Sequence, residues 1–592
     1  MNTFTNRFAG IASIASVALA LISTGIMAAP ELVVINANIT AADGEQYRAL
    51  SVENGVFSEF SNRADALLSQ ADNNTTVIDA KGKRLIAGIN DSHLHVTRGG
   101  RFYNLETRWE GVTSLKAGLA MLKAQAERTP KGQWVRVVGG FSPYQFEEKR
   151  LPTPQELTAI APDTPIFVLH LYSGGVLNQK ALEVLNINKD TKAPEGSVIE
   201  RDAAGNPTYV LLAQPNPMIL YKTIAALPQM TTGQQLNSSR QFYRKLLSLG
   251  VTSVIDAGGG GHTFPDDYIA SETLAKQGEL PLRVSNYLFP QVPAKEMLNF
   301  MQWMHAFEAD ENHHSHLENG YVIEGGGELL TYRASDYENF RAPRPELPDD
   351  AEHALEEVIR LHLLEGWPFR LHATYDESIT RILNVLEHIH NTQRVDGVRW
   401  IIDHAETVSD ANLARIKKLG GAIAVQGRMA FAGEDFVSRY GKAQAARTPP
   451  VQAIIDAGII VGLGTDGTRV SSFNPWATYY WAVTGKTIGG FALGSTPLER
   501  QTALQLFTSG SAALSGEEAL KGQLKPGFYA DFAILNHDIL RVDEDALLNT
   551  QSQLTVVGGK IVFADRQDYP EHYIAPLRAE PSWSPVNFDT QR

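Results

Sequence analysis

Residues 85–95 read Leu-Ile-Ala-Gly-Ile-Asn-Asp-Ser-His-Leu-His, and this stretch indicates how the chain folds. Leu85–Ile89 is a short apolar run that predicts a buried β-strand, and the strand leads directly to His93 and His95. Side chains alternate across an extended chain, so two histidines two positions apart share one face. Such a pair alone is weak evidence for a metal site. The interpretation depends on which residues follow the other strands.

Three more residues with metal-binding side chains follow predicted strands. His372 and His404 each end a strand, in Arg-Leu-His-Ala and Ile-Asp-His-Ala, and Asp466 follows another in Gly-Thr-Asp-Gly. A parallel barrel places its active site at the carboxyl ends of its strands. Core histidines and a helix-capping Asp would explain any one of these residues, but not all of them together with His93 and His95. The pattern predicts a metal site at a barrel mouth.

Residues 84–515 are predicted to form a (β/α)8 TIM barrel, so the fold class is α/β. Apolar runs of strand length alternate there with helical patterns, which is typical of βα units around a parallel sheet. The candidate strands outnumber the eight of a barrel, so some belong to insertions. In chain order they are Leu85–Ile89, Trp134–Val138, Ile166–Leu169, Val251–Ile255, Val284–Leu288, Tyr321–Ile323, Phe369–His372, Arg399–His404, Ala422–Gln426 and Ile459–Gly464.

Short β-rich segments flank the predicted barrel on both sides. The first part is residues 29–83, in which Asn54-Gly55 is a hairpin turn. The second part, with a C-terminal tail, is residues 516–592, in which Gly558-Gly559 turns the chain. We expect the two parts to form one small β-sandwich, with the barrel inserted between them.

The first 28 residues have the order of a secretory signal peptide. Arg7 precedes an apolar stretch from Phe8 to Ile26, and small residues follow at Ala28 and Ala29. We therefore expect a secreted or periplasmic protein, with a retained membrane anchor as the alternative. No later segment has the length of apolar sequence that a membrane helix requires, so stable membrane insertion is not expected after cleavage.

Composition limits the ligands and partners of the chain. The formal net charge of −14 argues against a nucleic-acid surface, which needs clustered Lys and Arg. The chain has 0 cysteines, so a metal must be held by His and carboxylates. Such ligands suit Zn²⁺ or another divalent transition metal, as one ion or two. The expected partner is a small-molecule substrate, and a homo-oligomer is left open.

The order of these motifs resembles the amidohydrolase superfamily, and within it amidohydrolase family 3, the YtcJ-like proteins and the N-substituted formamide deformylases. The resemblance covers nearly the whole mature chain. It is carried by Val33–Asn38, Gly82–His95, Gly250-Val-Thr-Ser-Val and Gly522–Leu535. It implies a metal-dependent hydrolase with His93, His95, His372 and His404 as metal ligands and Asp466 as both ligand and general base.

One departure from the family pattern concerns the fourth barrel strand. Many members carry a carboxylated Lys there that bridges two metals, but this chain has no Lys between Lys295 and Lys417. Glu324, after the strand at Tyr321, could bridge in its place, and Glu328 is the rival. The other interpretation is a single metal and a solvated loop carboxylate.

The long connection predicted for Gly427–Pro450 follows the candidate strand Ala422–Gln426. Long loops at this end of a barrel commonly cover the substrate. Its Arg428 could hold a substrate carboxylate, or it could lie on the surface without such a role.

The function predicted from these residues is hydrolysis of a carbon–nitrogen bond, other than a peptide bond, in a small amide or an N-acyl or N-formyl compound. Metal-activated water is the expected nucleophile, with Asp466 as the general base. A cyclic amidine deaminase, or a lactonase or other esterase, could use the same residues. A third alternative is a periplasmic binding protein that has lost catalysis, although Asp466 would then have little purpose.

Overall fold

The computed structural model describes residues 29–306, 320–337 and 339–588. The predicted signal peptide, residues 1–28, lies outside this part of the chain. Within the described ranges, no helix combines the length and the apolar character needed to cross a bilayer.

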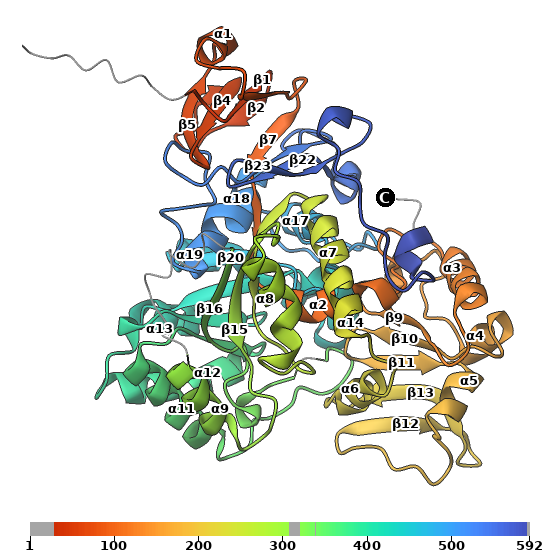
Figure 1. Cartoon of the computed structure of the whole chain (residues 1–592). Coiled ribbons are helices and arrows are strands. Elements are labelled where there is room, and N and C mark those ends of the chain that lie inside the picture. Colours follow the sequence, from red (N-terminus) through yellow and green to blue (C-terminus); the bar gives the residue numbers. More distant parts are fainter. Residues whose placement is uncertain (1–28, 307–319, 338, 589–592) are drawn as a thin grey trace, which may run out of the picture.

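Eight parallel strands form the predicted barrel (Figure 1). Each strand pairs with its neighbour in chain order, from β8 to β20. A backbone hydrogen bond from Ser92 N–H to Leu463 O, 3.2 Å long, connects the first and last strands. The strands are β8 (Ile89–Asp91), β14 (Val251–Asp256), β15 (Arg283–Leu288), β16 (Tyr321–Gly326), β17 (Phe369–Ala373), β18 (Trp400–His404), β19 (Ala422–Gln426) and β20 (Val461–Gly464).

Helices surround the barrel, as the alternating pattern predicts, and several of them are amphipathic. In α12, for example, Ile379, Ile382, Leu383, Leu386 and Ile389 are buried, which is the spacing of one helix face. The helices are α2 (Val96–Phe102), α7 (Thr232–Leu247), α8 (Ile269–Lys276), α9 (Glu296–Ala306), α11 (Ala351–Glu365), α12 (Asp376–His390), α13 (Asp410–Lys418), α14 (Arg428–Tyr440), α15 (Lys442–Ala445), α16 (Val451–Asp456), α17 (Pro475–Thr484), α18 (Arg500–Gln505) and α19 (Ser511–Leu514).

Two sheets at one end of the molecule form the predicted β-sandwich, and strands from both ends of the chain lie side by side in it (Figure 1). Apolar residues of both sheets, such as Leu32 and Leu554, share one core. The first sheet contains β1 (Leu32–Ile35), β4 (Ala49–Glu53), β5 (Val56–Ser61) and β6 (Thr76–Asp79), and α1 (Ala64–Leu68) follows β5. The second contains β2 (Asn38–Thr40), β3 (Gln46–Tyr47), β7 (Arg84–Ala87), β21 (Phe532–Leu535), β22 (Ser552–Val557) and β23 (Lys560–Ala564).

The strand predicted at Leu85–Ile89 is in fact two strands that belong to different sheets. β7 pairs with β21 in the sandwich, and β8 pairs with β14 in the barrel. Gly88 lies between them, and a Cβ added there would lie 2.0 Å from the Thr252 hydroxyl oxygen. Only glycine allows so close an approach, so this residue lets one apolar run pass from the sandwich into the barrel.

The surplus strand candidates belong to an insertion between β8 and β14, which forms a separate sheet with its own cores (Figure 1). Its strands are β9 (Val135–Val138), β10 (Ile166–His170), β11 (Gly174–Leu177), β12 (Ser197–Arg201) and β13 (Pro207–Ala213). Its helices are α3 (Leu115–Arg128), α4 (Pro154–Ile160), α5 (Gln179–Val184) and α6 (Met218–Ala225). The candidates Trp134–Val138 and Ile166–Leu169 therefore lie in this insertion.

Candidate metal centre and active site

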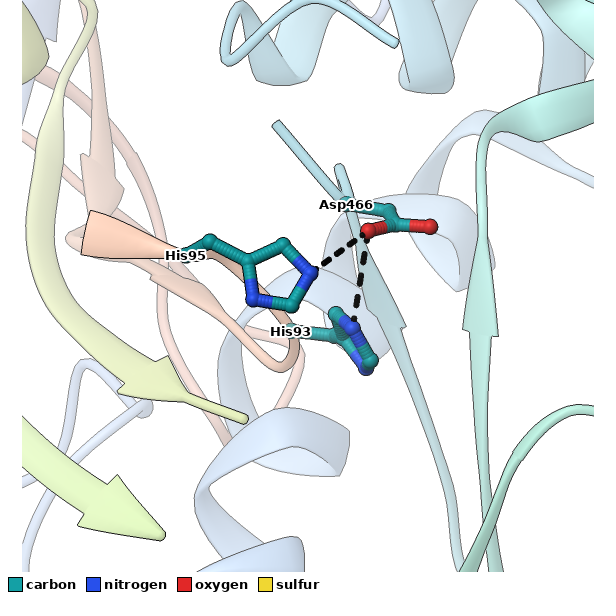
Figure 2. Close-up of side chains that lie close together, drawn as sticks. All are labelled: His93, His95 and Asp466. Atoms are coloured by element: carbon teal, nitrogen blue, oxygen red, sulfur yellow. Dashed lines mark hydrogen bonds and ion pairs between the residues drawn. The ribbon is translucent and has the colours of Figure 1, made fainter. Parts of the chain in front are cut away.

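The barrel brings five predicted site residues together at the carboxyl ends of its strands. His93 and His95 follow β8, His372 lies in β17, His404 ends β18 and Asp466 follows β20. Figure 2 shows His93, His95 and Asp466 converging. The Oδ1 atom of Asp466 lies 3.0 Å from His95 Nε2 and 3.6 Å from His93 Nε2.

A buried carboxylate at the end of β8 fixes the relative positions of His93 and Asp466. Asp91 Oδ1 accepts hydrogen bonds from the backbone N–H groups of His93 (3.1 Å) and Thr465 (2.9 Å). Its Oδ2 accepts from the Thr465 hydroxyl at 2.6 Å. The backbone N–H of Asp466 donates to His93 O at 2.7 Å. The loops after the first and eighth strands are thus joined directly beneath the site.

Glu328, the rival candidate on the fourth strand, lies among the four histidines. Its Oε2 is 2.9 Å from both His372 Nδ1 and His404 Nε2. Its Oε1 lies 3.8 Å from His93 Nε2 and 3.7 Å from His95 Nε2. The two oxygens of one carboxylate therefore face two different pairs of imidazoles.

Glu324, the preferred candidate for a bridging carboxylate, does not join this cluster. It lies within β16, two residues before its end, and its buried side chain pairs with Arg399. The fourth strand is longer than the predicted Tyr321–Ile323, so Glu324 is a strand residue and Glu328 follows the strand end. Whether Glu324 or Glu328 lies among the histidines therefore depends on the residue at which this strand ends.

Two buried aspartates that the sequence reasoning missed orient the histidines. Asp403 Oδ1 lies 2.8 Å from His93 Nδ1, and Asp403 also pairs with the buried Arg370. Asp336 accepts backbone hydrogen bonds from Thr374 and Tyr375 and lies 3.4 Å from His372 Nε2. Such contacts set the tautomer and orientation of a ligating imidazole. The position of Asp403, directly before His404 in the sequence, could have identified it as a residue near the site.

Arg428 is buried in the site and is not a surface residue of a loop. The segment predicted as a long connection is mostly helical, with α14 beginning at Arg428. Arg428 Nη2 donates to Asp466 Oδ2 at 2.9 Å and lies 3.2 Å from His404 Nδ1. Its Nη1 lies 3.2 Å from Glu406. One helix thus supplies a cation that holds the Asp466 carboxylate.

The electrostatics of the cluster keep its carboxylates ionised. Burial raises the pKa of Asp466, but the hydrogen bond from His95 and the charges of His93 and Arg428 outweigh it and hold that pKa well below its usual range. Burial raises the pKa of Glu328 too, and the surrounding imidazoles reverse the effect, so its pKa is also low. Both side chains are therefore ionised at neutral pH and can bind cations.

The residues of this cluster fit a metal ion. The sets His93, His95, Asp466 and His93, Glu328, His404 each have ligand atoms within 4.8 Å of one another. Among the described residues, His93 Nε2 is buried and has no hydrogen-bond partner. An unsatisfied buried nitrogen aimed at two carboxylates is costly unless a ligand completes it. Imidazole nitrogens and carboxylate oxygens are also the donor set that Zn²⁺ prefers.

Comparison with known proteins identifies the family of this chain. The sequence model of the amidohydrolase family, Amidohydro_3, matches residues 76–563, most of the chain. This chain belongs to the amidohydrolase family. The amidohydrolase is therefore an enzyme that hydrolyses carbon–nitrogen bonds, and the predicted family resemblance is confirmed.

Two curated relatives align with the amidohydrolase over nearly their whole length. YtcJ of Bacillus subtilis is 24% identical over 539 residues, covering 88% of this chain and 97% of the relative. The N-substituted formamide deformylase of Arthrobacter pascens is 24% identical over 558 residues, covering 89% and 97%.

A solved structure supports the fold. An uncharacterized metal-dependent hydrolase from Pyrococcus horikoshii OT3 superposes with a TM-score of 0.60 at 22% identity, covering 87% of this chain and 99% of the other. The (β/α)8 barrel with a β-sandwich built from both chain ends is thus confirmed.

Proposed function

We propose that the amidohydrolase uses two divalent metal ions, bridged by Glu328, to hydrolyse a carbon–nitrogen bond in a small N-acyl or N-formyl compound. The observation that carries the proposal is the position of Glu328. One of its oxygens faces His93 and His95, and the other is within hydrogen-bond distance of His372 and His404. A carboxylate in that position supplies the negative charge that a carboxylated Lys provides in many members of the family.

Each ion would be held by a separate set of side chains. His93, His95 and Asp466 form the first set, and His372 and His404 form the second, with Glu328 shared between them. Zinc suits these nitrogen and oxygen ligands best. When bound, the metal supplies Lewis-acid polarisation of the substrate carbonyl and a more acidic water.

Asp466 is the residue placed to move the proton. It takes a proton from the attacking water at one carboxylate oxygen and returns it to the leaving nitrogen, so that the amine departs neutral. Arg428 holds the other oxygen at 2.9 Å, which fixes the direction in which the acceptor points. His95 Nε2 lies 3.0 Å from the first oxygen, Oδ1, so each carboxylate oxygen has its own contact.

The choice of substrate class is supported by the relatives. The chain aligns with 97% of a protein named as an N-substituted formamide deformylase. A formyl or short acyl group is a small carbonyl substituent on nitrogen, and it suits a buried site. A deaminase or an esterase with the same residues would release a different leaving group. Assays of the products can therefore distinguish these activities.

The test combines metal analysis with turnover. The purified protein is analysed for metal by mass spectrometry and assayed on N-formyl and N-acyl amines, a cyclic amidine and a lactone, before and after chelation. The proposal expects about two metals per chain and amine release that stops with chelator and returns with Zn²⁺. Turnover of the lactone or amidine alone, or a metal-loaded protein that releases no amine from any compound, would contradict it.

A further inference from the structure

A buried arginine next to the site forms no ion pair with any Asp or Glu among the described residues. Arg98 lies on α2, three residues after His95, and only 3% of it is exposed. Among the described residues its Nε and Nη2 atoms are buried without any hydrogen-bond partner. Asp466 and Asp256 are near enough to influence its charge, but neither forms an ion pair with it. Asp256 instead accepts backbone hydrogen bonds from Thr97 and Gly258.

A second arginine lies beside Tyr172 and Tyr221, the two tyrosines that also interact electrostatically with Arg98. Arg469 follows Asp466 by three residues and is 4% exposed. Its side chain contacts two tyrosines. Nη1 is 3.4 Å from the Tyr172 hydroxyl, and the guanidinium lies 5.3 Å from the centre of the Tyr221 ring. Tyr221 donates to the Tyr172 hydroxyl at 2.8 Å. In the part of the chain that the structure describes, no Asp or Glu forms an ion pair with Arg469.

Among the described residues, two other buried arginines of this barrel each have the acidic partner that Arg98 and Arg469 do not. Arg370 pairs with Asp403, and Arg283 pairs with Asp531 at 2.8 Å. A buried guanidinium without an ion-pair partner is costly, because the charge has lost its water and has no direct counter-ion. Two of them next to an active site, one on α2 and one after β20, indicate a site for an anion that comes with the ligand.

Glycine residues after β14 let the backbone pass close to the side chains around Arg98. A Cβ added at Gly259 would lie 2.9 Å from His95 Nδ1 and 3.1 Å from Arg98 Nη1. A Cβ added at Gly260 would lie 3.2 Å from the Tyr221 ring. The Gly259 backbone thus lies against both an imidazole of the metal cluster and the guanidinium of Arg98, so Arg98 lies beside the cluster.

A small cavity lies near these residues. It is lined by Arg428, which holds Asp466, and by Tyr172, which contacts Arg469. The cavity is therefore one side chain away from Asp466 and one side chain away from Arg469.

We propose that Arg98 and Arg469 bind a carboxylate of the substrate, so that the amidohydrolase acts on N-acyl or N-formyl amino acids and not on neutral amides. The inference rests on the proposed function for the position of the scissile bond. A guanidinium presents parallel N–H donors that match the two oxygens of a carboxylate. Arg98 supplies the unsatisfied donors, and Arg469 adds a second positive charge.

The experiment compares matched compounds that differ only in the carboxylate. N-formylphenylalanine is paired with N-phenethylformamide, and N-formylleucine with N-isopentylformamide. We expect the Arg98→Met variant to lose about 100-fold in kcat/KM for the acids and less than about 3-fold for the neutral formamides, because two charge-assisted hydrogen bonds are removed. Arg469→Met should act in the same direction. Arg63→Met, a matched change at an exposed arginine of the sandwich, should change neither.

Binding measurements separate this inference from the proposed function. If none of the four compounds is hydrolysed, the proposed function fails for formamides, and calorimetry with the same compounds decides the inference. Tighter binding of the acids that weakens about 100-fold in Arg98→Met supports it. The inference is overturned if an acid and its neutral partner show equal turnover or equal binding. It is also overturned if neither of them binds. Arg98→Lys and Arg469→Met keep the test available if Arg98→Met does not fold.

Discussion

Replacing Glu328 by glutamine tests the bridging carboxylate most directly. The amide keeps the volume and one oxygen of the side chain but removes the charge between the two pairs of imidazoles. His372 and His404 then retain no anionic ligand between them, because Asp466 lies 3.9 Å from His404 Nδ1 and on the side of the other pair. We expect the ion of this second set to be lost first.

The size of the effect follows from the number of ligands. Protein sites with four ligands bind Zn²⁺ with roughly 10 to 16 kcal/mol, so one ligand contributes about 3 kcal/mol. At about 1.4 kcal/mol per factor of ten, its loss weakens binding by roughly 100- to 1,000-fold. A site that is full at micromolar zinc in the parent protein should be largely empty in Glu328→Gln.

Glu324→Gln is the matched control. Glu324 is four residues away and carries the same charge, but it pairs with Arg399 outside the cluster. We expect it to keep the metal affinity of the parent and to lose about 1–3 kcal/mol of stability, because the Arg399 guanidinium loses its counter-ion.

Metal content after equilibration with zinc buffers, measured by mass spectrometry for the parent and both variants, decides the assignment. Circular dichroism melts show whether each variant is folded. A Glu328→Gln protein that binds two ions with the parent's affinity would refute the bridge. Loss of metal in a folded Glu324→Gln would restore the original sequence prediction.

Three further outcomes are expected. Asp466→Asn should keep part of its metal, because the histidines remain, and should lose ~100- to 10,000-fold in kcat; a fully active, metal-loaded variant would rule out the proton-transfer role. Replacing His93 and His95 together with Ala should lower the metal stoichiometry of a soluble protein, since residues at this barrel face serve chemistry more than packing; an unchanged stoichiometry would argue against both ligands. We also propose that residues 1–28 are removed during export, so N-terminal sequencing of periplasmic protein should begin near Ala29, and an intact Met1 in soluble protein would count against it.

The strand-end histidines could be found from sequence because the barrel imposes a simple rule. His372 and His404 lie at the ends of apolar runs that helical patterns separate, and such runs align in register when parallel strands pair. Nothing beyond strand order was needed to expect these residues beside His93 and Asp466. The insertion was foreseen only as a surplus of strands, since no local signal assigns a strand to one sheet or another.

The fourth-strand carboxylate was harder, because Glu324 and Glu328 differ only in where the strand ends. The segment Glu-Gly-Gly-Gly-Glu suggests an early turn, but β16 continues through Gly326. There the chain passes beside Phe300 and His362, too close for any side chain at Gly326. These glycines therefore reflect close packing within a strand, which a single sequence does not distinguish from a turn.

Arg428 illustrates a second limit. Local pattern describes the segment after Gln426 as a connection, whereas its apolar residues Met429, Phe431 and Phe436 are buried as one helix. The ion pair with Asp466 joins residues of different barrel units. Such a contact exists only once the barrel has closed, so the tertiary fold determines it.

The pairing of β7 with β21 bears on how the molecule is made. Ala87 and Phe532 are partners in one sheet, although the entire barrel and its insertion separate them along the chain. The sandwich core cannot be completed until the last strands have been synthesised, and a non-local pairing of this kind forms slowly. Until then β7 is an exposed edge, attached through Gly88 to the strand that leads to His93. A chain truncated before β21 would therefore lose more than a peripheral sheet, because the first barrel strand would have no fixed attachment, and aggregation through the open edge would compete with folding.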